Sequence, residues 1–144
     1  MEHAAPSGSH GLIERMAAHL RHAGLRPTRQ RVDLGRILFA KGDRHVSAEE
    51  LHAEAESAGV RVSLATVYNA LHQFTEAGLL REVAIDGSRT YFDTNVSDHH
   101  HFFVEGEGQL IDLVGDVGID RLPQPPPGME ITSVEVVVRV RRRL

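Results

Sequence analysis

The chain has 144 residues, a length that suits one domain or two very small ones. Its 16 basic and 20 acidic side chains give a formal charge of -4, which argues against a uniformly basic protein but allows a localised basic face. It has no cysteine, which excludes disulfides, cysteine nucleophiles and thiolate metal sites. No apolar run reaches the roughly 18 residues of a membrane helix, and the first residues lack a signal peptide's apolar core, so we expect a cytoplasmic protein with no membrane contact.

Three helices are predicted in the first part of the chain. Apolar residues recur at helical spacing over 12–20, and Gly24 follows as a helix-ending residue. Thr28 is a candidate N-cap for a second helix that extends to about residue 41. The segment Ser47-Ala-Glu-Glu is a capping box, so a third helix is expected to begin there and to stop before Gly59.

A fourth helix is predicted between Ser63, as its N-cap, and Gly78. Its apolar face is formed by Leu64, Val67, Leu71 and Phe74. Its other face carries small, polar or aromatic side chains of the kinds that read base edges, namely Ala65, Thr66, Tyr68, Asn69, His72 and Gln73.

A β-hairpin is predicted next, with strands over 80–85 and 89–93 joined through Asp86-Gly87. Short helices followed by a hairpin indicate a winged helix, in which the fourth helix enters the major groove and Arg89 contacts the backbone. A helical domain with an incidental hairpin is the alternative that this pattern leaves open.

The remaining residues predict a small second region with strands over 101–105, 109–114 and 134–140. Residues 116–122 suit one helical turn, and the proline-rich segment 123–128 suits a stiff loop. Three strands bury too little surface for a stable core, so pairing with a second copy is expected. The predicted organisation is a flexible tail over 1–10, a winged helix over 11–94 and a second domain over 95–144, an α+β fold overall.

Charge is divided unevenly along the chain. Residues 1–44 hold eight basic and four acidic side chains, whereas the remaining 100 residues carry a net charge of -8. This asymmetry favours one face for a polyanion and another region for cations.

The second half contains three consecutive histidines, His99-His100-His101. On a strand, alternate side chains share a face, so His99 and His101 are expected to point together while His100 points away. With nearby carboxylates they suit Fe²⁺, Mn²⁺ or Zn²⁺. The candidate ligands are His45, Asp93, His99, His101 and Asp112.

Other functions fit the same histidines. Haem is an alternative or additional ligand, held by His99, His100 or His101. A non-haem metal enzyme using His99, His101 and Asp112 is a second alternative. We expect no enzyme, because the roughly 49 residues after Asn95 are too few to enclose a substrate pocket. A metal-buffering protein, whose helical half is only structural, is the third alternative function.

Three segments resemble the ferric uptake regulator family of bacterial metal-dependent repressors. They are residues 24–31 (GLRPTRQR), 45–51 (HVSAEEL) and 63–68 (SLATVY). The resemblance implies a homodimer with an N-terminal winged helix, a C-terminal α/β dimerisation domain and a regulatory metal held by the same five candidate residues. Residues 69–78, the histidine run and the proline-rich end resemble the iron response regulator (Irr) branch, which implies haem sensing through the triple histidine.

The sequence also departs from the family pattern. Val104 and Glu107 stand where that family has a cysteine pair of its structural zinc site, and Ile119 and Val134 stand where a second site would have ligands. An aspartate at position 93 resembles the peroxide- and manganese-responsive branches.

We therefore expect a DNA-binding regulator, mainly a repressor, that controls iron homeostasis in response to a metal or haem. Its partners would be a double-stranded operator and a second copy. A manganese-, zinc- or peroxide-responsive repressor is the alternative within the family. The residues expected to contact DNA are Arg29, Arg31, Thr66, Tyr68, Asn69 and Arg89.

Overall fold

The computed structural model describes residues 8–86, 89–97, 99–115 and 117–144. The chain forms two compact units, Met1–Val96 and Ser97–Leu144, and each is described here by itself. Helices are confined to the first unit within this described part, and both units contain a sheet, so the fold is α+β. No helix among these residues is both long and apolar enough to cross a bilayer.

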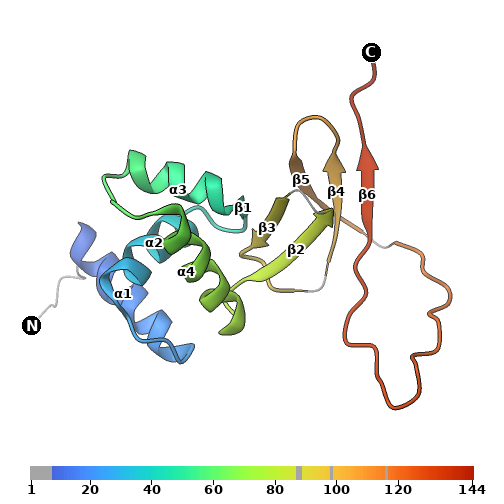
Figure 1. The fold of residues 1–144 in the computed structure, drawn as a ribbon, viewed down its shortest axis with the longest axis horizontal. Coiled ribbons are helices and arrows are strands. Elements are labelled where there is room, and N and C mark those ends of the chain that lie inside the picture. The colour runs from blue at the N-terminus through green and yellow to red at the C-terminus, as the bar shows by residue number, and fades with distance from the viewer. Residues whose placement is uncertain (1–7, 87–88, 98, 116) are drawn as a thin grey trace, which may run out of the picture. The chain divides into compact units, whose positions relative to one another are not determined.

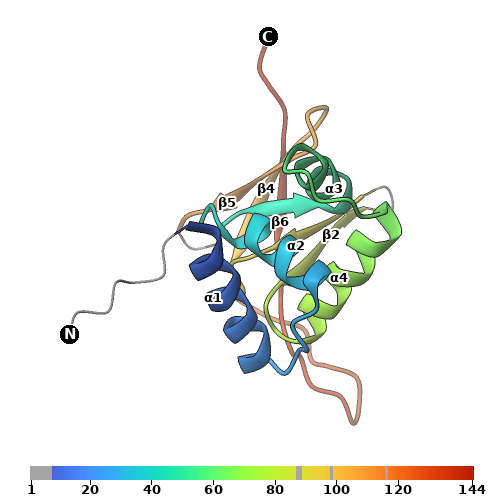
Figure 2. The ribbon, with the colours of Figure 1, turned by 90° about the vertical axis from the view of Figure 1, so that its left-hand side faces the viewer.

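The first unit contains four helices, α1 (Gly8–His22), α2 (Arg29–Phe39), α3 (Ala48–Ser57) and α4 (Leu64–Glu76). Helix α2 contacts the other three, and Figure 2 shows it between α1 and α4. The four predicted helices are therefore confirmed.

The predicted helix caps are also confirmed. The hydroxyl oxygens of Thr28, Ser47 and Ser63 accept hydrogen bonds from backbone N–H groups three residues later, at 3.3, 3.2 and 3.1 Å. Each cap satisfies one of the N–H groups that a helix start leaves without a partner. At the other ends, Gly24 and Gly78 take positive φ angles of 84° and 81°, which only glycine adopts without strain.

The helices and the sheet of the first unit share one apolar core. Leu20 of α1, Leu38 of α2 and Phe74 of α4 are fully buried in it. Leu64 differs from the prediction, because 36% of its surface is exposed although the pattern placed it on the inner face of α4. It is the first residue of the helix and lies beyond the core.

The sheet of the first unit has three strands, β1 (His45–Ser47), β2 (Arg81–Asp86) and β3 (Arg89–Asp93), in the antiparallel order β1-β3-β2. Strand β1 was not predicted, because three residues are too few to show an alternating pattern. The turn expected at Asp86-Gly87 includes residues outside the described part, but Asp86 does pair with Arg89 across it.

The second unit is a mixed sheet of β4 (His100–Val104), β5 (Gln109–Leu113) and β6 (Val137–Val140). Figure 1 shows β4 in the middle, antiparallel to β5 and parallel to β6. Strand β6 begins three residues later than predicted, because the N–H of Val136 donates to Nδ1 of His100 (3.0 Å) instead of to a neighbouring strand.

The helical turn expected over 116–122 is wrong for residues 117–122, which have no helix, and Asp116 lies outside the described residues. Gly118 and the following Pro123 both disfavour a helix within so short a segment. The expected stiff loop over 123–128 has no helix or strand.

One cluster of polar contacts fixes the start of β1. The guanidinium of Arg44 forms two hydrogen bonds with the carboxylate of Glu54 on α3. The backbone N–H of Arg44 donates to the hydroxyl of Thr94 (2.8 Å), whose own N–H donates to the carbonyl of Arg44 (3.0 Å). Strand β1 is thereby attached to α3 on one side and to the end of β3 on the other.

Replacing Glu54 by glutamine should destabilise the first unit in a pH-dependent way. The hydrogen bond from Arg44 lowers the pKa of Glu54 below its ordinary 4.5, so the ionised carboxylate stabilises the folded chain above that pH. We expect a loss of roughly 1 kcal/mol at pH 7 in chemical unfolding, with the gap closing as the pH falls below 4.5 through the folded-state pKa. Glu76→Gln, an exposed change at the end of α4, is the matched control. A Glu54→Gln deficit that persists unchanged at low pH would contradict this role.

Candidate metal centre and nucleic-acid interface

The first unit brings together two of the five predicted metal ligands. The register of β1 on β3 places His45 opposite Asp93, with Nε2 and Oδ2 3.1 Å apart. Asp93 is only 1% exposed, and its other oxygen accepts a hydrogen bond from the N–H of Asn95 (2.8 Å). A carboxylate buried this deeply needs a cationic or hydrogen-bonding partner on each side. The pair therefore places one imidazole and one carboxylate side by side, at the first residue of β1 and the last residue of β3.

The second unit brings together the other three. Asp112 on β5 pairs in register with His101 on β4. One of its carboxylate oxygens lies 3.0 Å from Nε2 of His99 and 3.5 Å from Nε2 of His101. The two imidazole rings have their centres 4.5 Å apart, so His99 and His101 share a side as the alternation predicted. His101 is 2% exposed.

The remaining histidine of the run makes a different contact. His100 uses Nδ1 to accept the hydrogen bond from Val136, the residue directly before β6. His99, in contrast, has Nδ1 2.7 Å from the carbonyl of Ser97. A ring N–H donated to a carbonyl leaves the other nitrogen, Nε2, as the atom that can bind a metal.

The donor atoms of these groups fit a divalent ion. Imidazole nitrogens and carboxylate oxygens with no sulfur are ligands that Fe²⁺, Mn²⁺ and Zn²⁺ accept. In each unit the imidazole Nε2 already faces a carboxylate oxygen, which is the arrangement that an ion between them would use.

At the four positions where the sequence departs from the family pattern, the structure shows contacts or exposure that do not involve a metal. Val104 is buried and pairs with Gln109, and the carboxylate of Glu107 is bound by Arg142 (2.9 Å). Ile119 and Val134 are exposed apolar side chains.

Helix α4 carries three of the residues predicted to contact DNA. Tyr68 donates its hydroxyl hydrogen to the carboxylate of Glu49 on α3 (2.8 Å), a partner that was not predicted from the sequence. That bond raises the pKa of Tyr68 above 10. The pKa of Glu49 is lowered by a backbone hydrogen bond at the start of α3, then by Tyr68 and, more weakly, by the charge of Arg89. Tyr68, Glu49 and Arg89 thus form one electrostatic group.

A polar hollow of about 290 Å³ separates the start of α2 from α4. Its polar lining consists of Thr28, Gln30, Arg31, Thr66, Asn69 and Gln73. Arg31, predicted as a phosphate contact, donates from Nε to the side chain of Gln73 (3.1 Å) and from Nη1 to the carbonyl of Arg26 (2.8 Å). Arg29 is 95% exposed at the first turn of α2, and Asn69 is exposed beside the hollow.

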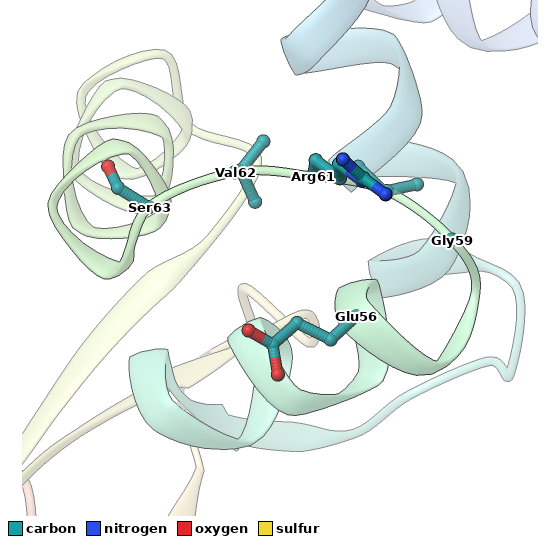
Figure 3. A pocket seen from close by; sticks show the side chains of 6 residues that line it. Glu56, Gly59, Arg61, Val62 and Ser63 are labelled. Atoms are coloured by element: carbon teal, nitrogen blue, oxygen red, sulfur yellow. The ribbon is translucent and has the colours of Figure 1, made fainter.

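The connection from α3 to α4 positions the N-terminus of α4. Nε2 of His52 hydrogen-bonds with the carbonyl of Val62 (2.9 Å), which ties this connection to α3. Figure 3 shows Glu56 extending from α3 toward the segment that carries Val62 and Ser63, where a hollow of about 610 Å³ is formed. Because Ser63 caps α4, this contact helps to fix the start of that helix.

The fold defines a winged-helix unit joined to a small mixed sheet, and similarity to known proteins extends over nearly all of it. The model of the Ferric uptake regulator family matches residues 22–138. The Ferric uptake regulation protein of Pseudomonas aeruginosa is 34% identical over 130 residues, which is 88% of this chain and 96% of that protein. The Peroxide-responsive repressor PerR of Staphylococcus aureus is 33% identical over 101 residues, 70% of this chain and 68% of that protein.

A solved structure of the Pseudomonas aeruginosa ferric uptake regulator with manganese has a TM-score of 0.66 and 28% identity, covering 90% of this chain and 98% of that one. The Vibrio cholerae regulator, at a TM-score of 0.67 and 22% identity, shares the fold over 88% of this chain and 98% of its own. This chain therefore belongs to the ferric uptake regulator family. Its members are metal-responsive transcription regulators and not enzymes, which removes the metal-enzyme alternative.

The contact between Tyr68 and Glu49 can be tested by titration. We expect Glu49→Gln to lower the pKa of Tyr68 toward 10, because the phenol loses its hydrogen bond to a carboxylate and its ionisation no longer places two negative charges together. Absorbance near 295 nm between about pH 8 and 12 measures this. The chain has only one other tyrosine, Tyr91, which is buried. Glu50→Gln removes the same charge one residue away and should leave the Tyr68 titration unchanged. An equal effect of both changes would show that the contact does not exist.

Proposed function

We propose that this protein represses transcription when one divalent metal ion takes ligands from both of its units. The ligands would be His45 and Asp93 from the first unit and His99, His101 and Asp112 from the second. The observation that carries the proposal is that each unit already groups its share of these side chains around a buried member, Asp93 or His101. When bound, such an ion would hold the two units at one relative angle.

Dimerisation through the second unit is the next part of the proposal. The second unit exposes large apolar side chains, among them Val114 directly after β5 (95%), and Met129 (67%) and Leu122 (52%) in the segment between β5 and β6. A sheet of this size buries too little surface by itself to be stable. A second copy would cover these side chains, and a two-fold dimer presents two copies of α4 to the half-sites of a palindromic operator.

The same ion would then control DNA affinity. Two reading helices must be about 34 Å apart to enter successive major grooves on one side of the duplex. A metal that favours the angle with this spacing by only about 1–3 kcal/mol changes affinity roughly 5- to 150-fold. The exposed Arg29 and Arg89 would contact phosphates, while Tyr68, Thr66 and Asn69 would face bases.

The proposal also includes the identity of the metal that the protein binds in the cell. Nitrogen and oxygen donors with two carboxylates suit Fe²⁺ and Mn²⁺ as well as Zn²⁺. We propose iron, with control of iron homeostasis genes as in the iron response regulator branch that the sequence resembles. A manganese- or peroxide-responsive repressor is the alternative, and the aspartate at position 93 favours it.

Haem has less support from the same residues. A haem ligand needs an accessible imidazole nitrogen, but His101 is 2% exposed and Nδ1 of His100 accepts a hydrogen bond from the chain itself. Haem sensing through His99, His100 and His101 stays a prediction.

The shared ion can be tested by metal titration of the stripped protein with Mn²⁺, Fe²⁺ and Zn²⁺. We expect Asp93→Asn and Asp112→Asn each to weaken binding of the same single ion by at least about tenfold and to weaken operator binding in parallel, because each removes a charged ligand. Glu107→Gln, a carboxylate bound by Arg142, is the control. If Asp93→Asn leaves one ion bound with unchanged affinity, the two groups are separate sites and the proposal is wrong.

The reading surface can be tested with operator DNA. Tyr68→Ala should weaken specific binding roughly 5- to 150-fold while non-specific binding and the dimer are unchanged, because only a base contact is lost. Arg29→Gln should instead weaken binding to all sequences alike and reduce the salt slope by about 1. Equal operator affinity before and after Tyr68→Ala would remove Tyr68 from the reading surface.

A further inference from the structure

The first unit has a hollow of about 630 Å³ that neither the metal nor the DNA-reading surface uses. It lies between α1 and α2, beside the end of α3. Its volume falls within the range of about 300–1,000 Å³ that is usual for small-molecule sites. All of its lining residues belong to the first unit.

The floor of this hollow is apolar. Met16, Ile37 and Phe39 line it while packing against the core of the first unit. Leu12 lies at the edge with 47% of its surface exposed. A second hollow of about 480 Å³ continues past Ile37 and Ala40 toward α3, so apolar surface extends along the outer side of α2.

The edge of the hollow is basic. It carries Arg15, His19 and Arg36, against one acidic residue, Asp33. Nη1 of Arg36 lies 3.9 Å from Asp33, too far for a hydrogen bond. The Nε of Arg36 is buried and has no hydrogen-bond acceptor within the described part of the chain. The Arg36 side chain as a whole is 30% exposed and lines the hollow, so its guanidinium can be reached by a ligand that enters there.

We propose that this hollow binds a small amphipathic carboxylate, whose acidic group meets Arg36 and Arg15 and whose hydrocarbon tail covers the floor. Charge complementarity selects an anion, because a neutral or cationic molecule would supply no charged acceptor for Arg36. The apolar floor selects a molecule with a tail, because a fully hydrated anion such as phosphate gains nothing from Met16, Ile37 and Phe39. The carboxylate gives the DNA-binding unit a small-molecule ligand distinct from the metal.

This inference does not depend on the proposed metal or DNA functions. It concerns residues of α1, α2 and the end of α3 that take no part in either. It can therefore be tested on the metal-stripped protein without operator DNA, and its failure leaves the proposed function unaffected.

The test is calorimetric titration with sodium decanoate below its micellar concentration, compared with 1-decanol and decyltrimethylammonium. We expect decanoate to bind with a stoichiometry of about one per chain and at least tenfold more tightly than either analogue, because a charge-assisted hydrogen bond contributes roughly that factor. Equal binding of the three molecules would show simple partition into apolar surface and would overturn the proposal.

Two variants locate the site. Arg36→Gln keeps much of the side-chain length but removes the charge, and should weaken decanoate binding at least tenfold while leaving decanol binding unchanged. Ala40→Trp places bulk at the exposed edge of the hollow and should reduce the binding of both. Arg21→Gln, an exposed change elsewhere on α1, is the matched control. Far-ultraviolet circular dichroism confirms that each variant is folded, and unchanged decanoate affinity in a folded Arg36→Gln protein would exclude the assignment.

Discussion

The pairing of β1 with β3 is the constraint on which the candidate metal centre depends. Three residues of β1 have little intrinsic tendency to form a strand, and they are held in place by contacts on both sides. The ion pair between Arg44 and Glu54 fixes the chain on α3, and the exchange of hydrogen bonds between Arg44 and Thr94 fixes it on the end of β3. A shift of one residue would turn His45 away from Asp93 and leave that carboxylate buried without its imidazole.

The sequence predicted those parts of the fold that local chemistry determines. Serine and threonine caps, glycines after helices and the 3.6-residue period depend on a few neighbouring residues, so α1 to α4 were predicted with their caps. Strand alternation likewise placed His99 and His101 on one side. Strand β1 was missed because its pairing with β3 joins residues almost 50 positions apart. The delayed start of β6 has the same kind of cause, a long-range hydrogen bond from Val136 to His100.

The sequence predicted which residues form the candidate metal centre, but it did not predict the distances between their side chains. The histidine run and the aspartates were evident, whereas the distances within each unit depend on strand register. For the proposed DNA-reading surface, the position of a residue was predictable but its side-chain contacts were not. Tyr68 was predictable from its position on α4, but its contact with Glu49 comes from the packing of α3 against α4. If Tyr68 contacts DNA as proposed, that contact changes what it would offer, because a tyrosine whose hydroxyl donates to a carboxylate presents mainly its ring and its oxygen lone pairs.

The absence of cysteine affects the second unit more than the first. A thiolate zinc site can supply folding free energy directly to a small domain, and this chain must obtain it elsewhere. Within its described residues the second unit has three strands, no helix and a buried imidazole, His101, beside a partly exposed carboxylate, Asp112. Burial of its exposed apolar side chains by a second copy and neutralisation of Asp112 by a metal ion would both stabilise this sheet. Because anything that binds only the folded form adds to its stability, dimerisation and metal binding would reinforce one another through the folding of this unit, without any further contact between the two sites.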